Sequence, residues 1–203
     1  MDKSDNKKLN IGLYGGTFDP VHNVHLELAE VALRTANLNK VIFVPAGIPP
    51  HKYKVYADSL HRYNMLTLAL KDKPYFEISK YEIEKPEPSY SVYTIKYFKN
   101  IYPSANINLI LGYDSLIDVP NWFHSDEVIK IVDRFLVASR HVSNSATNSL
   151  PEILTKKVLF LPFEPKDIAS HYIRELVRDG KPITGLVPPE VERYIYENKL
   201  YRD

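Results

Sequence analysis

Short apolar runs rich in Val, Ile, Leu and Phe recur along the chain and alternate with segments of helical length. The apolar runs predict strands at residues 9–14, 40–45, 76–83, 106–111, 134–139 and 158–161. The segments between them predict helices at residues 25–37, 59–70, 91–101, 126–132, 169–178 and 189–198. Asp58 precedes the second of these helices and is expected to be its N-cap.

This alternation is typical of an α/β protein with a parallel sheet covered by helices on both faces. The uninterrupted apolar run at residues 41–44 fits a strand that is buried on both sides. We therefore expect a Rossmann-like, doubly wound sheet in a single domain with a helical C-terminal part. The domain should comprise residues 9–203, after a flexible tail at residues 1–8. In such sheets ligands bind beyond the carboxyl ends of the strands, which selects the loops after residues 14, 45, 111 and 161.

Composition narrows the classes of function. With 203 residues, the chain is long enough to bury a substantial core as one domain. Its net charge of +1 gives no general attraction to nucleic acid or to a membrane surface. It contains no cysteine, which excludes disulfides, thiolate catalysis and zinc–thiolate sites. Signal-peptide features and an apolar stretch of roughly 20 residues are both missing, so we expect a cytoplasmic protein with no nucleic-acid or membrane partner.

The first of the selected loops carries two glycines and two histidines. Gly15 and Gly16 end the first apolar run, and His22 and His25 follow at the predicted start of a helix. Glycine lets backbone amides approach an anion closely, and a helix N-terminus adds positive potential, so this segment favours a phosphate site. One alternative is a tight turn with two surface histidines. Another is a metal site, because three-residue spacing puts both imidazoles on one helix face.

Later segments carry further candidates. Two prolines stiffen the loop that holds Lys52, which is otherwise a solvated surface lysine. Ser170 and Arg174 lie at a predicted helix start, where they either bind phosphate oxygens or form an ordinary cap with an exposed arginine. Trp122 is the only tryptophan and suits either core packing or stacking on a flat ring. Asp114 follows a glycine at a strand end, where it either binds ribose hydroxyls or caps the short helix that follows.

Five motifs occur in order along the chain. They are Gly-Gly-Thr-Phe-Asp-Pro-Val-His at 15–22, Pro-Pro-His-Lys at 49–52, Ser-Tyr-Ser at 89–91, Gly-Tyr-Asp at 112–114 followed by Trp122, and Ile-Ala-Ser-His-Tyr-Ile-Arg at 168–174. Together they resemble the nucleotidylyltransferase superfamily and, within it, the bacterial nicotinate-nucleotide adenylyltransferases. The resemblance runs from about residue 10 to residue 201, and its specificity comes from five ordered matches rather than from any one.

The resemblance implies transfer of the adenylyl group of ATP to nicotinate mononucleotide, giving deamido-NAD and pyrophosphate by direct in-line attack. Mg²⁺ would be bound mainly through the ATP phosphates. The residues implied in phosphoryl chemistry are His22, His25, Lys52 and Arg174. The implied ATP site comprises Gly15, Gly16, Thr17, Phe18, His22, His25, Gly112, Asp114, Ile168, Ser170 and Arg174. The mononucleotide site comprises Lys52, Ser91, whose amide would meet the nicotinate carboxylate, and Trp122, which would stack on the pyridine ring.

The chain departs from the family pattern at four positions, one of which is Ser91 in place of a threonine. Val24 stands where the family has a glycine between its two histidines, and a branched side chain there would move the adenine or change the local backbone. Ala169 and His171 replace a serine and a threonine. Two alternatives stay open: another nucleotidylyltransferase of this fold, acting on phosphopantetheine or a polyol phosphate, and a nucleotide-binding sensor without catalysis. The sequence leaves open whether subunits associate into a homo-oligomer.

Overall fold

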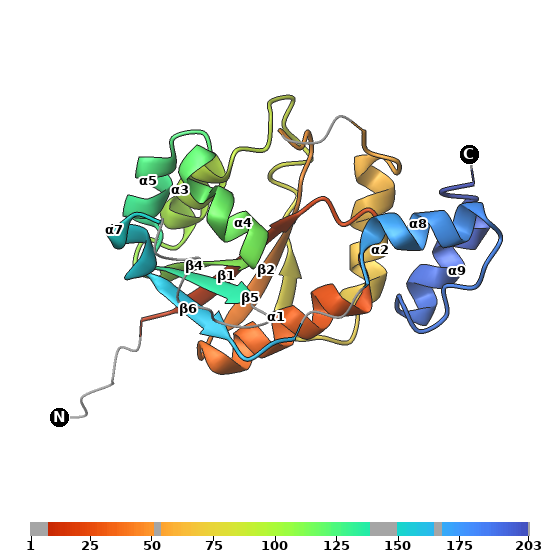
Figure 1. The fold of residues 1–203 in the computed structure, drawn as a ribbon, viewed down its shortest axis with the longest axis horizontal. Coiled ribbons are helices and arrows are strands. Elements are labelled where there is room, and N and C mark those ends of the chain that lie inside the picture. The colour runs from red at the N-terminus through yellow and green to blue at the C-terminus, as the bar shows by residue number, and fades with distance from the viewer. Residues whose placement is uncertain (1–7, 51–53, 139–149, 165–167, 203) are drawn as a thin grey trace.

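The computed structural model describes residues 8–50, 54–138, 150–164 and 168–202. Within these ranges, six parallel strands form one sheet in the order β3-β2-β1-β4-β5-β6 (Figure 1). Their bounds are β1 (Asn10–Gly16), β2 (Lys40–Pro45), β3 (Phe76–Ile78), β4 (Asn106–Gly112), β5 (Arg134–Ala138) and β6 (Val158–Leu161). The order reverses between β1 and β4, which makes the sheet doubly wound and confirms the predicted fold class.

Helices cover both faces of the sheet. Buried residues of α1 (Asn23–Thr35), α2 (Ser59–Leu70), α8 (Ser170–Arg178) and α9 (Pro189–Glu197) belong to one apolar cluster. The second cluster takes buried residues from α3 (Ser91–Ile101), α4 (Tyr113–Asp118), α5 (Ser125–Ile131) and α7 (Glu152–Thr155), and η1 (Val119–Asn121) adds Val119 to it. The C-terminal helices α8 and α9 lie beside α2 at one end of the sheet (Figure 1).

Strand β2 explains why two clusters form. Val41 and Phe43 belong to the first cluster, whereas Ile42 and Val44 belong to the second. Alternate side chains of a strand point to opposite faces, so an uninterrupted apolar strand supplies both. Every residue of the apolar run at 41–44, which predicted this strand, therefore packs in one of the two clusters.

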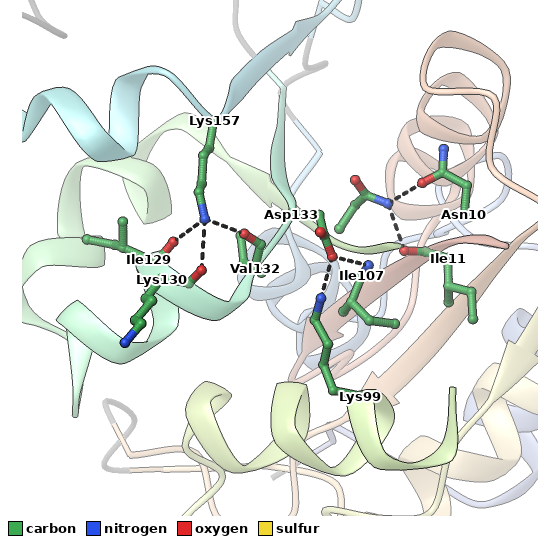
Figure 2. Close-up of polar contacts among 10 residues, drawn as sticks. Asn10, Ile11, Lys99, Ile107, Ile129, Lys130, Val132, Asp133 and Lys157 are labelled. Carbon is green, nitrogen blue, oxygen red and sulfur yellow. Dashed lines mark hydrogen bonds and ion pairs between the residues drawn. The ribbon is translucent and has the colours of Figure 1, made fainter. Parts of the chain in front are cut away.

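Polar contacts connect the amino ends of the strands, opposite the edge where ligands are expected (Figure 2). The Asp133 carboxylate accepts hydrogen bonds from Lys99 Nζ at 2.5 Å and from the Ile107 amide at 2.7 Å. The Lys157 ammonium lies at the end of α5 and donates to three carbonyls there, those of Ile129, Lys130 and Val132. A cation at a helix C-terminus is favourable, and burial lowers the pKa of Lys157.

Most element bounds follow the sequence. The bounds of β2, β6, α2 and α3 are as predicted, and the Asp58 carboxylate caps α2 by accepting the His61 amide at 2.8 Å. The prediction of a strand over residues 76–83 was wrong in its length, because β3 ends at Ile78 and residues 81–84 form a turn. The short helix α7 was not predicted. In the described ranges, no helix is both long and apolar enough to span a bilayer.

Candidate active site

The loop between β1 and α1, residues 17–22, leaves the carboxyl end of the central strand. Gly16 precedes it because the Phe18 ring lies so close that a Cβ at position 16 would be 2.9 Å from the ring Cζ. Phe18 itself has a φ of 51°, and its ring is buried against Tyr14 and Phe43. The peptide bond between Asp19 and Pro20 is cis. With its ring buried, Phe18 presents only backbone groups to a ligand.

The two histidines lie together at the start of α1. Their rings stack with centroids 3.6 Å apart, and the His22 amide donates to His25 Nδ1 at 3.2 Å. The His22 side chain is only 4% exposed, and this burial lowers its pKa to about 4, so the imidazole is neutral. Its Nδ1 is a buried polar atom without a hydrogen-bond partner. A buried, unpartnered ring nitrogen beside a helix N-terminus favours an anionic ligand.

Val24, between these histidines in sequence, is buried in the first apolar cluster. Helix α1 begins at Asn23 and continues without interruption past this position. The Asn23 amide donates to the Leu186 carbonyl at 3.0 Å, and its side chain donates to the Gly185 carbonyl at 2.8 Å. The branched side chain of Val24 is thus used for packing, in an ordinary first helical turn.

The Asp19 carboxylate forms hydrogen bonds that connect this loop to distant parts of the chain. One oxygen accepts the Tyr56 amide at 2.8 Å, and the other accepts the Ala57 amide at 3.1 Å and the Tyr201 hydroxyl at 2.8 Å. Tyr201 is buried, and desolvation raises the pKa of its hydroxyl. With three donors, Asp19 acts on the shape of the loop rather than as a ligand for a bound cation.

Arg62 was not among the predicted site residues. Its guanidinium, on a side chain only 1% exposed, donates from Nη1 to the Thr17 carbonyl at 2.8 Å and from Nε to the Ala57 carbonyl at 3.1 Å. Nη2 lies 3.5 Å from the Gly47 carbonyl. Desolvation lowers the pKa of Arg62, and the nearby Asp19 charge acts in the opposite direction. The sequence signal was a cation inside the apolar stripe of α2, four residues before Leu66.

Ser170 and Arg174 of α8 also hold the loop. Ser170 Oγ donates to the Pro20 carbonyl at 3.0 Å, and Arg174 Nη1 donates to the Asp19 carbonyl at 2.6 Å. The guanidinium lies over the Tyr56 ring, 4.2 Å from its centroid. Arg174 Nε is buried and has no hydrogen-bond partner. The loop therefore meets a cation whose buried Nε–H group is not engaged by the protein.

A cavity of about 500 Å³ opens at the carboxyl ends of β1, β2 and β4. Gly15, Gly16, Ala46 and Gly112 form part of its wall, so backbone is accessible at three strand ends. Ser91, the first residue of α3, lines the same cavity. Its volume suits a mononucleotide-sized ligand, and its position is the switch point where the strand order reverses.

Trp122 lines this cavity and is partly buried against the second apolar cluster. It follows η1, and its amide donates to the Val119 carbonyl at 3.1 Å. The neighbouring Phe123 stacks on Tyr90, with ring centroids 4.4 Å apart. Packing of the tryptophan is thus confirmed, whereas its stacking on a flat ring stays a prediction that its place in the cavity wall allows.

Other predicted residues lie elsewhere or outside the described ranges. Lys52 lies outside the described ranges. Asp114 is exposed in the first turn of α4, and the prediction that it caps this helix was wrong because α4 begins at Tyr113 with Gly112 as its N-cap. Ile168 is half-buried against the first apolar cluster. The carbonyl of Thr17 is taken by Arg62.

The donor set around the loop suits phosphate better than a bare metal ion. In the part of the chain that the structure describes, no group of three or more His, Asp or Glu side chains could hold a metal. The nearest buried carboxylate, Asp19, already accepts three hydrogen bonds. Imidazole and guanidinium nitrogens are strong partners for phosphate oxygens, so the side chains around the loop suit an anionic ligand.

Comparison with known proteins gives consistent results. The family model described as cytidylyltransferase-like matches residues 13–176. A "probable nicotinate-nucleotide adenylyltransferase" of Caldicellulosiruptor bescii is 36% identical over 96% of this chain and 100% of its own length. Its counterpart in Carboxydothermus hydrogenoformans is 37% identical over 95% of this chain and 98% of its own length.

A solved structure of similar fold is the nicotinic acid mononucleotide adenylyltransferase of Plasmodium falciparum, complexed with NaAD. It has a TM-score of 0.75 and 20% identity, and the match covers 95% of this chain and 97% of that one. A second structure of that protein, complexed with APC, has a TM-score of 0.73 and the same coverage. At this identity the likeness shows the fold.

Proposed function

The chain belongs to the cytidylyltransferase-like family, and from this premise we propose that it transfers the adenylyl group of ATP to nicotinate mononucleotide, forming deamido-NAD and pyrophosphate. One observation carries the proposal. A histidine pair with an unpartnered buried nitrogen lies where the loop after β1 enters α1, and the last two residues of β1 line a mononucleotide-sized cavity that Trp122 also lines. One strand end therefore serves both a phosphate site and a site for a flat ring.

The reaction needs positioning more than acid–base chemistry. A 5′-phosphate oxygen of nicotinate mononucleotide forms a bond to the α-phosphorus of ATP. The bond from that phosphorus to the bridging oxygen breaks, and pyrophosphate leaves with the electron pair. The nucleophile is already an anion at neutral pH, so no general base is required. The protein has to align two polyanions and stabilise the charge that develops on the transferring and leaving oxygens.

The residues divide this work between them. We assign His22 and His25 to the ATP phosphates, with His25 nearest the α-phosphoryl group. Arg174 would use guanidinium N–H groups beyond the one that holds the Asp19 carbonyl toward the triphosphate, and Ser170 would fix the loop that ends at His22. Lys52 is proposed as a further phosphate ligand on the strength of its motif alone. Mg²⁺, carried on the triphosphate, would neutralise negative charge on its oxygens.

The mononucleotide would occupy the cavity. We propose that its pyridine ring stacks on Trp122 and that its carboxylate meets the first turn of α3. The amides of Ser91 and Val92 precede the first backbone bond of that helix, which runs from the Tyr93 amide to the Tyr90 carbonyl at 3.1 Å. Tyr90 is the N-cap and makes no side-chain capping bond. Open amides and the helix dipole both favour a carboxylate over a neutral amide at this place.

The test is a pyrophosphate-release assay with ATP, Mg²⁺ and a panel of acceptors, with deamido-NAD identified by chromatography. Nicotinate mononucleotide should be the preferred acceptor over nicotinamide mononucleotide, phosphopantetheine and glycerol phosphate. The His25→Ala variant should lose about tenfold to a thousandfold in kcat, the usual scale for one transition-state donor. Arg34→Ala, at the exposed far end of the same helix, is the matched control. Binding of both nucleotides without pyrophosphate release would refute the proposal.

A further inference from the structure

Glu82 is a buried carboxylate in the wall of the cavity, with no role in the chemistry described above. It lies in the turn after β3 and is only 8% exposed. The turn packs tightly on the loop after β2, since a Cβ at Gly47 would lie 2.1 Å from the Glu82 carbonyl oxygen. An ionisable group buried in a site for an anionic ring needs a physical reason to be there.

Two hydroxyl groups supply partners for this carboxylate. Thr94 Oγ1 donates to Glu82 Oε1 at 2.5 Å, and the Ser89 hydroxyl forms the second hydrogen bond. Ser89 Oγ in turn accepts the Gly47 amide at 2.9 Å, which leaves its own hydrogen for Glu82. Burial raises the pKa of Glu82, and both hydroxyl hydrogen bonds act in the opposite direction. The carboxylate is thus occupied by protein donors.

The two hydroxyls lie on either side of the α3 N-terminus. Ser89 immediately precedes the N-cap Tyr90, and Thr94 is the fourth residue of the helix. Both line the cavity together with Ser91. A single carboxylate therefore connects the segment entering α3 to its first turn, and through Ser89 it also connects that segment to the loop after β2.

We infer that Glu82 is a positioning and specificity-determining residue, which holds the first turn of α3 so that its open amides meet the carboxylate of the pyridine mononucleotide. This inference rests on the proposed function. It assigns discrimination between the acid and the amide form of the acceptor to a residue whose carboxylate is bound by protein hydroxyls. Loss of Glu82 should make the first turn of α3 less well positioned and weaken the binding of the acceptor. The ATP site at the β1–α1 loop should be unchanged.

The experiment compares Glu82→Ala with wild type by steady-state kinetics in both substrates. The KM for nicotinate mononucleotide should rise about tenfold, the KM for ATP should change less than twofold, and the preference over nicotinamide mononucleotide should fall. Glu82→Gln keeps an acceptor oxygen and should restore part of this loss. Glu84→Gln is the matched control, because Glu84 is exposed in the same turn. Equal rises in both KM values would overturn the inference.

Two further measurements keep the test decisive. Thr94→Val removes one hydroxyl at nearly constant volume, so it should raise the same KM even where Glu82→Ala fails to fold; an unchanged KM would refute the inference. Trp122 fluorescence, excited selectively in this single-tryptophan chain, reports mononucleotide binding without turnover. Wild-type protein that binds the mononucleotide but forms no deamido-NAD would refute the proposed function alone. Unaltered binding by the Glu82 variants would refute the role of Glu82.

Discussion

Acidification should destabilise the folded protein through His22. The side chain is buried, and desolvation lowers its pKa from 6.5 to about 4 in the folded state. Between these two values the unfolded chain binds a proton at His22 and the folded protein does not. The free energy of unfolding therefore decreases as the pH is lowered through this window. The contribution of neutral His22 is fully present above pH 6.5 and is lost as the pH falls through about 4.

The size of this effect follows from the two pKa values. The difference between 6.5 and about 4 corresponds to about 3 kcal/mol in the free energy of unfolding, at about 1.4 kcal/mol for each tenfold change in affinity. Between pH 7 and pH 5 the linkage relation gives about 2 kcal/mol of this total. That is a substantial part of the roughly 5–15 kcal/mol that stabilises an ordinary domain.

Urea unfolding at pH 7, 6 and 5 measures the effect. Other groups titrate in the same range, so the quantity to compare is the pH-dependent loss in wild type minus the loss in His22→Gln, which cannot take up the proton. Wild type should lose about 2 kcal/mol more than this variant between pH 7 and pH 5. His171→Gln, at an exposed position, should behave like wild type. Equal losses in wild type and His22→Gln would refute the reasoning.

Three further predictions concern the surroundings of the site. Arg62→Met should lower the free energy of unfolding by about 3–5 kcal/mol, because it leaves buried carbonyls without donors, whereas exposed Arg34→Met should change it by less than about 0.5 kcal/mol in the same urea titration. Trp122→Ala should weaken the binding of nicotinate mononucleotide by about 1 kcal/mol or more and leave the binding of ATP unchanged in a binding titration. Weaker ATP binding with unchanged mononucleotide binding would exclude stacking. Gly47→Ala should lower the midpoint of thermal unfolding by several degrees, because its Cβ would clash with the Glu82 carbonyl; an unchanged midpoint would contradict the close approach.

The fold could be predicted because its elements depend on local patterns. Strand β2 is apolar at consecutive positions and supplies both core clusters. Asp58 caps α2 by accepting a hydrogen bond from the amide of His61, only three residues later in the sequence. The end of β3 could not be predicted in this way. Residues 80–83 alternate in polarity like a strand, but tertiary contacts with Gly47 and the hydroxyl of Ser89 accompany a turn there. Local pattern and tertiary context disagree at that point, and the context decides.

The site could be predicted only in part, for a related reason. The motifs contain the residues that we propose as ligand-binding, such as His22 and Trp122, because the chemistry of their side chains is visible in the sequence. Asp19 belongs to a motif too, yet one of its partners, Tyr201, is 182 residues away in sequence. Arg62 lies in no motif, and a single cation in an apolar helix stripe gives no indication of which carbonyls it meets. The partners of residues that hold a loop are identified only by the fold.

The two arginines at the β1–α1 loop illustrate how such residues differ in task. Arg62 is almost completely buried, and its donors are directed at backbone carbonyls, chiefly those of Thr17 and Ala57. In a trans peptide the next amide points opposite to the carbonyl, so the bond to Thr17 turns the Phe18 amide away from the guanidinium. Arg174 holds the Asp19 carbonyl, yet it is only partly buried and its Nε has no partner. Arg62 can therefore act only by shaping the loop, whereas Arg174 combines that role with the phosphate binding that we propose for its guanidinium. Substitution of Arg62 should therefore chiefly lower the free energy of unfolding, whereas substitution of Arg174 should chiefly weaken the binding of ATP.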